Sequence, residues 1–204
     1  MRVLEERLDK IKGELIELHR MSKNAVELSL KAALNDDVIR YQVEKIEKQA
    51  DVLNTDIEND SLAAVALFQP VAKDLRFLST VMRLSGNYER ITDLALKIAR
   101  FSISSKKFVE KLEVMQVIII EMFDIVERAL RGNTDRMRDE LISRDDKLDM
   151  LKQEIIDDLL GGELNQENLS ILLSAIHFER IGDILSKNGA RIIFINEGRR
   201  VWIK

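Results

Sequence analysis

The sequence predicts an all-α protein that consists of two pseudo-repeated antiparallel three-helix bundles. Apolar residues recur every three or four positions along almost the whole chain, which is the spacing of one helix face. The 204 residues include one proline and eight glycines, too few for the frequent turns of a strand-rich fold. A motif in the first half of the chain also recurs in the second half. Together these observations predict six long helices in two similar units.

Local signals place the three helices of the first half. We expect a helix over residues 3–34, then a break at Asn35-Asp36-Asp37 that caps a second helix over residues 37–68. Pro70 is the only proline of the chain, and proline is favourable in the first turn of a helix. It therefore marks the start of a third helix over residues 71–102.

The second half is expected to follow the same plan. Its helices are predicted over residues 108–131, 134–160 and 165–195. Residues 104–107, with the sequence SSKK, are predicted to link the two halves. Gly132-Asn133-Thr134 is expected to end one helix and cap the next, and Gly161-Gly162 to end the fifth helix. Because the connections are short, neighbouring helices should pack antiparallel.

The recurring motif defines the two units. The sequence YERITD at residues 88–93 recurs as FERIGD at residues 178–183, each time late in the third helix of its half. Such self-similarity is typical of a duplicated structural unit. We therefore predict two three-helix domains, residues 1–104 and residues 108–204.

The composition argues against several classes of protein. A net charge of −4 does not favour nucleic-acid binding, which needs a basic surface. The absence of cysteine excludes disulfides, thiolate zinc sites and iron–sulfur clusters. No apolar stretch approaches the ~20 residues of a membrane-spanning helix, and the first residues carry charges where a signal peptide is apolar. We expect a soluble cytoplasmic protein without a transmembrane segment.

Four acidic pairs lie at matching positions of the two predicted hairpins, namely Glu47/Asp51, Glu89/Asp93, Asp145/Asp149 and Glu179/Asp183. The members of each pair are four residues apart and therefore share one helix face. The first two pairs are equally far from Pro70, and the last two are equally far from residue 164 in the second predicted turn. Antiparallel hairpins should bring the two pairs of each half to the same height.

Carboxylates that gather in this way repel one another, and something must offset the repulsion. Protonation, basic partners or bound cations would do so. Arg90 and Arg180 are the obvious basic partners, but each points about 100° around the helix from the motif glutamate that it follows. Oxygen ligands favour hard cations such as Mg²⁺, Ca²⁺ or Mn²⁺, and also iron. The residues alone leave metal binding and salt-bridged structural clusters both open.

Further motifs make the chain similar to a known family. The sequence QPVAKDLR at residues 69–76, followed by ERITD at 89–93, resembles the PhoU family of phosphate-uptake regulators. ERIGD at residues 179–183 and IFINEG at 193–198 fit the family's second-half motif and C-terminal signature. The resemblance covers nearly the whole chain. It implies a fold of two three-helix bundles and a protein that is not an enzyme.

The resemblance also implies that the acidic motifs hold divalent or multinuclear metal, either iron, zinc, manganese or magnesium. Carried onto this chain, the ligands are Glu47, Asp51, Glu89, Asp93, Asp145, Asp149, Glu179 and Asp183. Relatives often have His and Asn one and four residues after the motif Asp. This chain has Leu94 and Lys97 there in its first half, and Ile184 and Lys187 in its second. A lysine beside each site could supply positive charge, so the metal's identity and number stay open.

The implied function is control of phosphate uptake and of phosphate-starvation signalling through protein partners. These partners are a phosphate-transporter ATPase and, in bacteria, a sensor kinase, which would bring the protein to the membrane periphery. The segment around Asp74 and Arg76 becomes a candidate contact surface, although Asp74 also suits the positive end of a helix. The oligomeric state is open, and a homo-oligomer is one alternative.

Two other functions stay open. The first is a structural helical scaffold whose acidic clusters are salt-bridged and bind no metal. The second is a carboxylate-bridged metalloenzyme. A ferritin-like metal site needs Glu three residues before a His, and neither His19 nor His177 has one. The sequence therefore disfavours the metalloenzyme.

Overall fold

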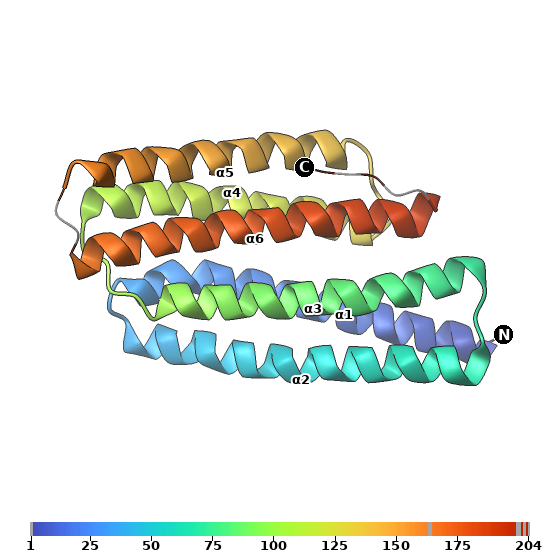
Figure 1. The fold of residues 1–204 in the computed structure, drawn as a ribbon. Coiled ribbons are helices and arrows are strands. Elements are labelled where there is room, and N and C mark those ends of the chain that lie inside the picture. Colours follow the sequence, from blue (N-terminus) through green and yellow to red (C-terminus); the bar gives the residue numbers. More distant parts are fainter. Residues whose placement is uncertain (1, 163–164, 199–200, 202, 204) are drawn as a thin grey trace.

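Two three-helix bundles lie side by side in the computed structural model, which describes residues 2–162, 165–198, 201 and 203 (Figure 1). These residues form six helices and no strand. The helices are α1 (Arg2–Ala33), α2 (Asp37–Phe68), α3 (Ala72–Ala99), α4 (Lys106–Leu130), α5 (Met137–Leu160) and α6 (Gln166–Glu197). α1, α2 and α3 pack on one another, and α4, α5 and α6 form the second bundle. The predicted fold is confirmed.

The turn between α2 and α3 lies where the sequence predicts it. Gln69 ends α2 in the left-handed conformation, with φ of 46°, and α3 begins two residues after Pro70. The predicted cap at the start of α2 is also present, because the Asp36 side chain accepts a hydrogen bond from the Ile39 backbone N–H at 2.9 Å. The hairpin therefore turns about Pro70, and residues equally far from it lie level.

α3 is shorter than predicted. It ends at Ala99 rather than at residue 102, because the chain leaves the helix to bond with the last residue of α1 and with the turn that follows α1. The Ile103 backbone N–H donates to the Ala33 carbonyl at 2.9 Å. The Ser102 hydroxyl donates to Oδ1 of Asn35 at 2.7 Å. The first of these bonds uses a backbone N–H that a longer α3 would have directed along its own axis.

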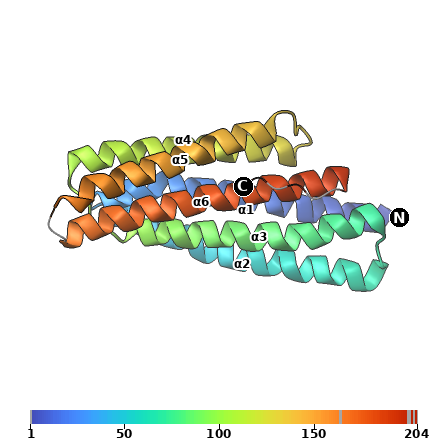
Figure 2. The same cartoon turned by 45° about the horizontal axis from the view of Figure 1, so that its top comes forward.

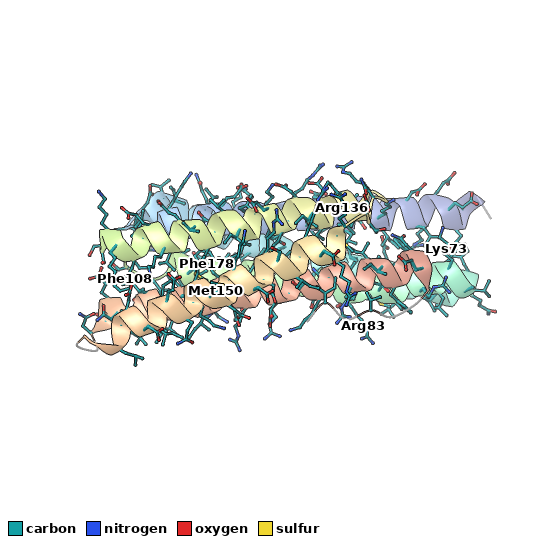
Figure 3. The ribbon with its side chains drawn as sticks, turned by 90° about the horizontal axis from the view of Figure 1, so that it is seen from above. Lys73, Arg83, Phe108, Arg136, Met150 and Phe178 are labelled. Atoms are coloured by element: carbon teal, nitrogen blue, oxygen red, sulfur yellow. The ribbon has the colours of Figure 1, made fainter. Side chains whose placement is uncertain are left out.

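The predicted start of α5 is wrong. The helix begins at Met137 instead of Thr134. Asn133 forms a turn of its own, in which its Oδ1 accepts the Asp135 backbone N–H at 3.1 Å. Arg136 then precedes the helix in the left-handed conformation, with φ of 53°; Figure 3 labels its place beside the start of α5. The local side-chain bond therefore delays the helix by three residues.

The second predicted turn, residues 161–165, includes residues 163 and 164, which lie outside the described part of the chain. On its far side the Asn165 side chain accepts the Asn168 backbone N–H at 2.8 Å and caps α6. α5 and α6 pack against each other as the second hairpin. Glu167, in the first turn of α6, accepts the backbone N–H of Ser104 at 2.7 Å and so ties the linker to this helix.

The two bundles meet through four helices. α3 and α6 lie side by side (Figure 2), and α1 packs on α4, whereas α2 and α5 are outermost (Figure 1). α3 and α6 run antiparallel: the Asn87 side chain donates to Asn188 at 2.6 Å, and Phe101 stacks on His177. Among the described helices, none is long and apolar enough to cross a membrane. The acidic pairs lie on the hairpins that include the outermost helices.

Candidate functional site

Each hairpin carries its two acidic pairs on helices that pack against each other. We call Glu47 and Asp51 on α2, with Glu89 and Asp93 on α3, the first acidic cluster. We call Asp145 and Asp149 on α5, with Glu179 and Asp183 on α6, the second acidic cluster. In each half the two helices that carry these residues pack directly on each other.

The negative charges of the first acidic cluster are poorly neutralised. Burial raises the pKa of Glu89 above its usual value, and the charges of Asp51, Asp93 and Glu47 raise it further. Burial, and then the charges of Asp51 and Asp93, also raise the pKa of Glu47. Among the described residues, these four carboxylates have one direct ion pair, from Lys97 Nζ to Asp93 Oδ2 at 2.7 Å. The carboxylates therefore lie close enough to repel one another.

A buried amide oxygen lies one helical turn beyond Asp51. Oδ1 of Asn54 is buried and accepts no hydrogen bond from the described part of the protein. A buried acceptor without a partner costs free energy. Amide oxygens are also common ligands of hard cations. Asn54 thus adds a neutral oxygen donor next to the first acidic cluster.

A lysine bridges the helices in the second acidic cluster. Lys152 Nζ lies 2.7 Å from Oε1 of Glu179 on α6 and 3.1 Å from Oδ1 of Asp149 on α5. Burial lowers the pKa of Lys152, but hydrogen bonds to Glu179 and Asp149 outweigh this effect, and the resulting pKa is above its usual value. Lys152 is therefore a firmly charged ammonium group between two carboxylates of the cluster.

Asp145 is the most deeply placed member of the second acidic cluster. Its exposed fraction is 4%, and the Ser186 hydroxyl donates to its Oδ1 at 3.5 Å. Gly182 of α6 lies against the same stretch of α5, where an added Cβ would come within 2.4 Å of the Leu148 side chain. A glycine at this position lets α5 approach α6 closely, so Asp145 is enclosed between the helices.

The chain matches known proteins along its length. A family model described as PhoU domain matches residues 15–102 and again residues 112–192. A phosphate-specific transport system accessory protein PhoU homolog of Archaeoglobus fulgidus is 38% identical over 205 residues, with all of both chains covered. The chain belongs to the PhoU family. A PhoU homolog 1 of Thermotoga maritima is 26% identical over 179 residues, which cover 82% of this chain and 77% of that protein.

Solved PhoU structures share the fold. The crystal structure of PhoU from Pseudomonas aeruginosa superimposes with a TM-score of 0.87 at 20% identity, over 96% of this chain and 99% of that chain. The PhoU structure from Streptococcus pneumoniae gives a TM-score of 0.82 at 19% identity, over 97% and 99% of the two chains. The two-bundle architecture is therefore that of PhoU proteins.

The two acidic clusters differ in how well they suit the metal that the PhoU resemblance implies. In the part of the chain that the structure describes, no three His, Asp or Glu side chains converge closely enough to hold a metal ion. The eight-ligand assignment therefore stays a prediction. The first cluster suits a cation chemically, because its oxygen donors repel one another and lack a bridging base. The second does not, because an ammonium group already joins its helices.

Lysines, and not the two motif arginines, form ion pairs with the acidic clusters. Lys97 pairs with Asp93 at 2.7 Å, and Lys187 pairs with Asp183 at 3.3 Å, each across one helical turn. Arg90 and Arg180, whose direction on the helix already argued against pairing with the motif glutamates, form no ion pair with the described residues. Each points away from its neighbouring glutamate because successive helical residues are about 100° apart.

Sequence reasoning missed Lys152 and Asn54. Both lie three residues after the second acid of their helix, on α5 and α2 respectively. Extending each acidic motif by one helical turn would have identified both residues as neighbours of the clusters. The sequence offers no signal that Lys152 contacts α6, because a lysine side chain is long enough to reach several partners.

The two histidines serve packing. His19 is fully buried, with its Nδ1 3.0 Å from the hydroxyl of Tyr88 and its ring edge-on to Phe123. Burial lowers the pKa of His19 to about 4, so the ring is neutral at neutral pH. His177 stacks on Phe101 at 6.0 Å between ring centres, and burial lowers its pKa. These contacts join the two bundles.

Proposed function

We propose that this protein is a non-enzymatic accessory regulator of phosphate transport that acts through protein partners. The observation that carries this proposal is the PhoU match in both halves, together with 38% identity over the full length of a phosphate transport accessory protein. We propose as partners a phosphate-transporter ATPase and, in bacteria, a sensor kinase. The protein would act in the cytoplasm and reach the membrane through them.

We also propose that the first acidic cluster binds a divalent metal ion. Glu47, Asp51, Glu89 and Asp93 would hold it, with the Asn54 amide as a further oxygen donor. An ion would neutralise the repulsion that raises the pKa values of Glu47 and Glu89. Bound there, it would join α2 to α3. All-oxygen donors favour magnesium, manganese or iron over zinc.

The metal content of a double variant tests this site. Glu89→Gln with Asp93→Asn should lower the bound metal measured by mass spectrometry after desalting, while circular dichroism shows unchanged helicity. Asp56→Asn with Glu58→Gln, two exposed acids further along α2, is the matched control and should keep the metal. Unchanged metal in the first variant would place the ion elsewhere.

The tip of the α2–α3 hairpin is the surface that we propose for partner binding. It extends beyond the end of α6, and Lys73 lies on it (Figures 1 and 3). Leu67, Val71 and Leu75 are all exposed there, Val71 by 76%. Exposed apolar side chains at one projecting end are typical of an interaction surface. The tip includes the QPVAKDLR segment on which the family resemblance depends.

Affinity capture of the phosphate-transporter ATPase from the same organism tests this surface. Val71→Asp with Leu75→Asp should reduce recovery of the ATPase by at least tenfold, because charge opposes burial of the tip. Val114→Asp with Val117→Asp changes two exposed residues of α4 and should leave recovery unchanged. Equal recovery with both variants would exclude the tip, and no recovery with the wild type would refute this partner.

A further inference from the structure

Lys152 and Asn54 occupy matching positions in the two halves of the protein. Each lies three residues after the second acid of its helix, Asp149 on α5 and Asp51 on α2. Residues three apart on a helix are surface neighbours, so each side chain lies beside its acidic cluster. At the same place the first half has a neutral amide and the second half has a cation.

Lys152 occupies the position that a bridging ion would need. Its Nζ donates hydrogen bonds to Glu179 at 2.7 Å and to Asp149 at 3.1 Å, and these carboxylates come from different helices. At such distances the ammonium group fills the space between the two oxygens. A metal ion that joined the same carboxylates would have to displace it.

The other lysines do not distinguish the two halves. Lys97 pairs with Asp93 in the first acidic cluster, and Lys187 pairs with Asp183 in the second, both between residues four apart. These two ion pairs are equivalent in position and charge. The bridge that Lys152 forms between two carboxylates of the second cluster is therefore what distinguishes the two halves.

We propose that the ammonium group of Lys152 replaces a metal ion in the second acidic cluster, so that the protein binds divalent metal in its first half only. The inference rests on the proposed metal binding of the first cluster. The side chains of Lys152 and Glu179 are 24% and 21% exposed. A metal ion would leave this half-buried ammonium group without a partner and next to a second cation.

A reciprocal exchange of the two residues tests the proposal. The full chain is titrated with Mn²⁺, and electron paramagnetic resonance measures the free ion. The wild type should bind one ion per chain, which Asp93→Asn removes and Asp183→Asn leaves in place.

Lys152→Asn should bind two ions, and Asn54→Lys should bind none. Lys147→Asn, which removes an exposed lysine of α5 that pairs with no described residue, should still bind one.

Several results would overturn the proposal. Two ions per wild-type chain would do so, as would a single ion that Asp183→Asn removes and Asp93→Asn does not. A folded Lys152→Asn or Lys152→Gln chain that binds no additional ion would also overturn it, with circular dichroism as the test of folding.

If the first acidic cluster does not bind metal, the titration gives a result that differs from all of those above. The wild type would then bind no Mn²⁺, which refutes the proposed site at Glu89 and Asp93. An ion bound by Lys152→Asn, and lost when Asp183→Asn is added, would still support the role of Lys152. No ion in Lys152→Asn would refute that role as well.

Discussion

The two acidic clusters have the same pattern of acidic residues but differ in how far basic side chains neutralise their charge. In the first, burial and mutual repulsion raise the pKa values of Glu47 and Glu89. In the second, Lys152 joins Glu179 to Asp149 across the helices. The comparison teaches that a duplicated motif places acidic pairs on the same helices of both halves, whereas one residue a helical turn away gives only the second cluster a bridging cation.

The largest effect that we predict is a loss of stability at acidic pH, which limits the pH range in which the two acidic clusters can be compared. His19 at the bundle interface has its pKa lowered from 6.5 to about 4, chiefly by burial. The unfolded chain therefore binds more protons than the folded chain between these values. We expect the free energy of unfolding to fall by up to about 3 kcal/mol as the pH drops from 6.5 to 4.

Urea denaturation at several pH values measures this effect. The charged neighbours of His19 on α1 and α4 are Arg20, Lys23, Asp124 and Glu127, whose opposing influences leave burial dominant. In His19→Gln the loss between pH 6.5 and 4 should be smaller by about the same 3 kcal/mol. An identical pH profile in this variant would assign the acid sensitivity to other groups.

The second largest effect should come from removing Lys152, the residue that distinguishes the two acidic clusters. In metal-free protein, Lys152→Met should lower the free energy of unfolding by about 1–2 kcal/mol, because two half-buried carboxylates lose a shared hydrogen-bonded cation. Lys147→Met should change it by less than about 0.5 kcal/mol. Equal effects of the two substitutions, measured by chemical denaturation with a chelator present, would contradict the bridging role of Lys152.

Substitution of the matching glutamates of the two clusters, Glu89 and Glu179, should change the stability of the protein in opposite directions. Glu89→Gln removes a charge from a site where ionisation is unfavourable, and should stabilise the metal-free protein by about 0.5–1 kcal/mol at pH 7. Glu179→Gln removes a partner of Lys152, and should destabilise it by about 1 kcal/mol. Thermal unfolding in the presence of a chelator gives both values. Shifts of the same sign would mean that the two clusters are equivalent.

The smallest change in stability should come from removing Lys97 or Lys187, and it should be the same in both halves. Lys97 and Lys187 form exposed ion pairs one helical turn from their aspartates. Lys97→Met and Lys187→Met should each change stability by less than about 0.5 kcal/mol, because water screens such pairs. A much larger effect in one half, measured by chemical denaturation, would show that Lys152 is not the only source of the asymmetry.

Much of the site could be predicted from the sequence because it depends on distances along helices. Apolar spacing indicates the helices, and Pro70 marks one turn. Pairs equally far from that turn must lie level, as Glu47/Asp51 and Glu89/Asp93 do. The start of α5 could not be predicted in this way, because Asn133 bonds to its own neighbouring backbone instead of capping the helix.

By itself, the sequence determined the six helices, their pairing into two bundles and the height at which acidic residues meet. These features depend on the regular rise and periodicity of a helix, which local residues control. Only the tertiary structure decided that Lys152 crosses to Glu179, that Arg90 has no described ion-pair partner, and that Asn54 buries an amide oxygen. Long side chains choose among neighbours from other helices, and those neighbours exist only after packing.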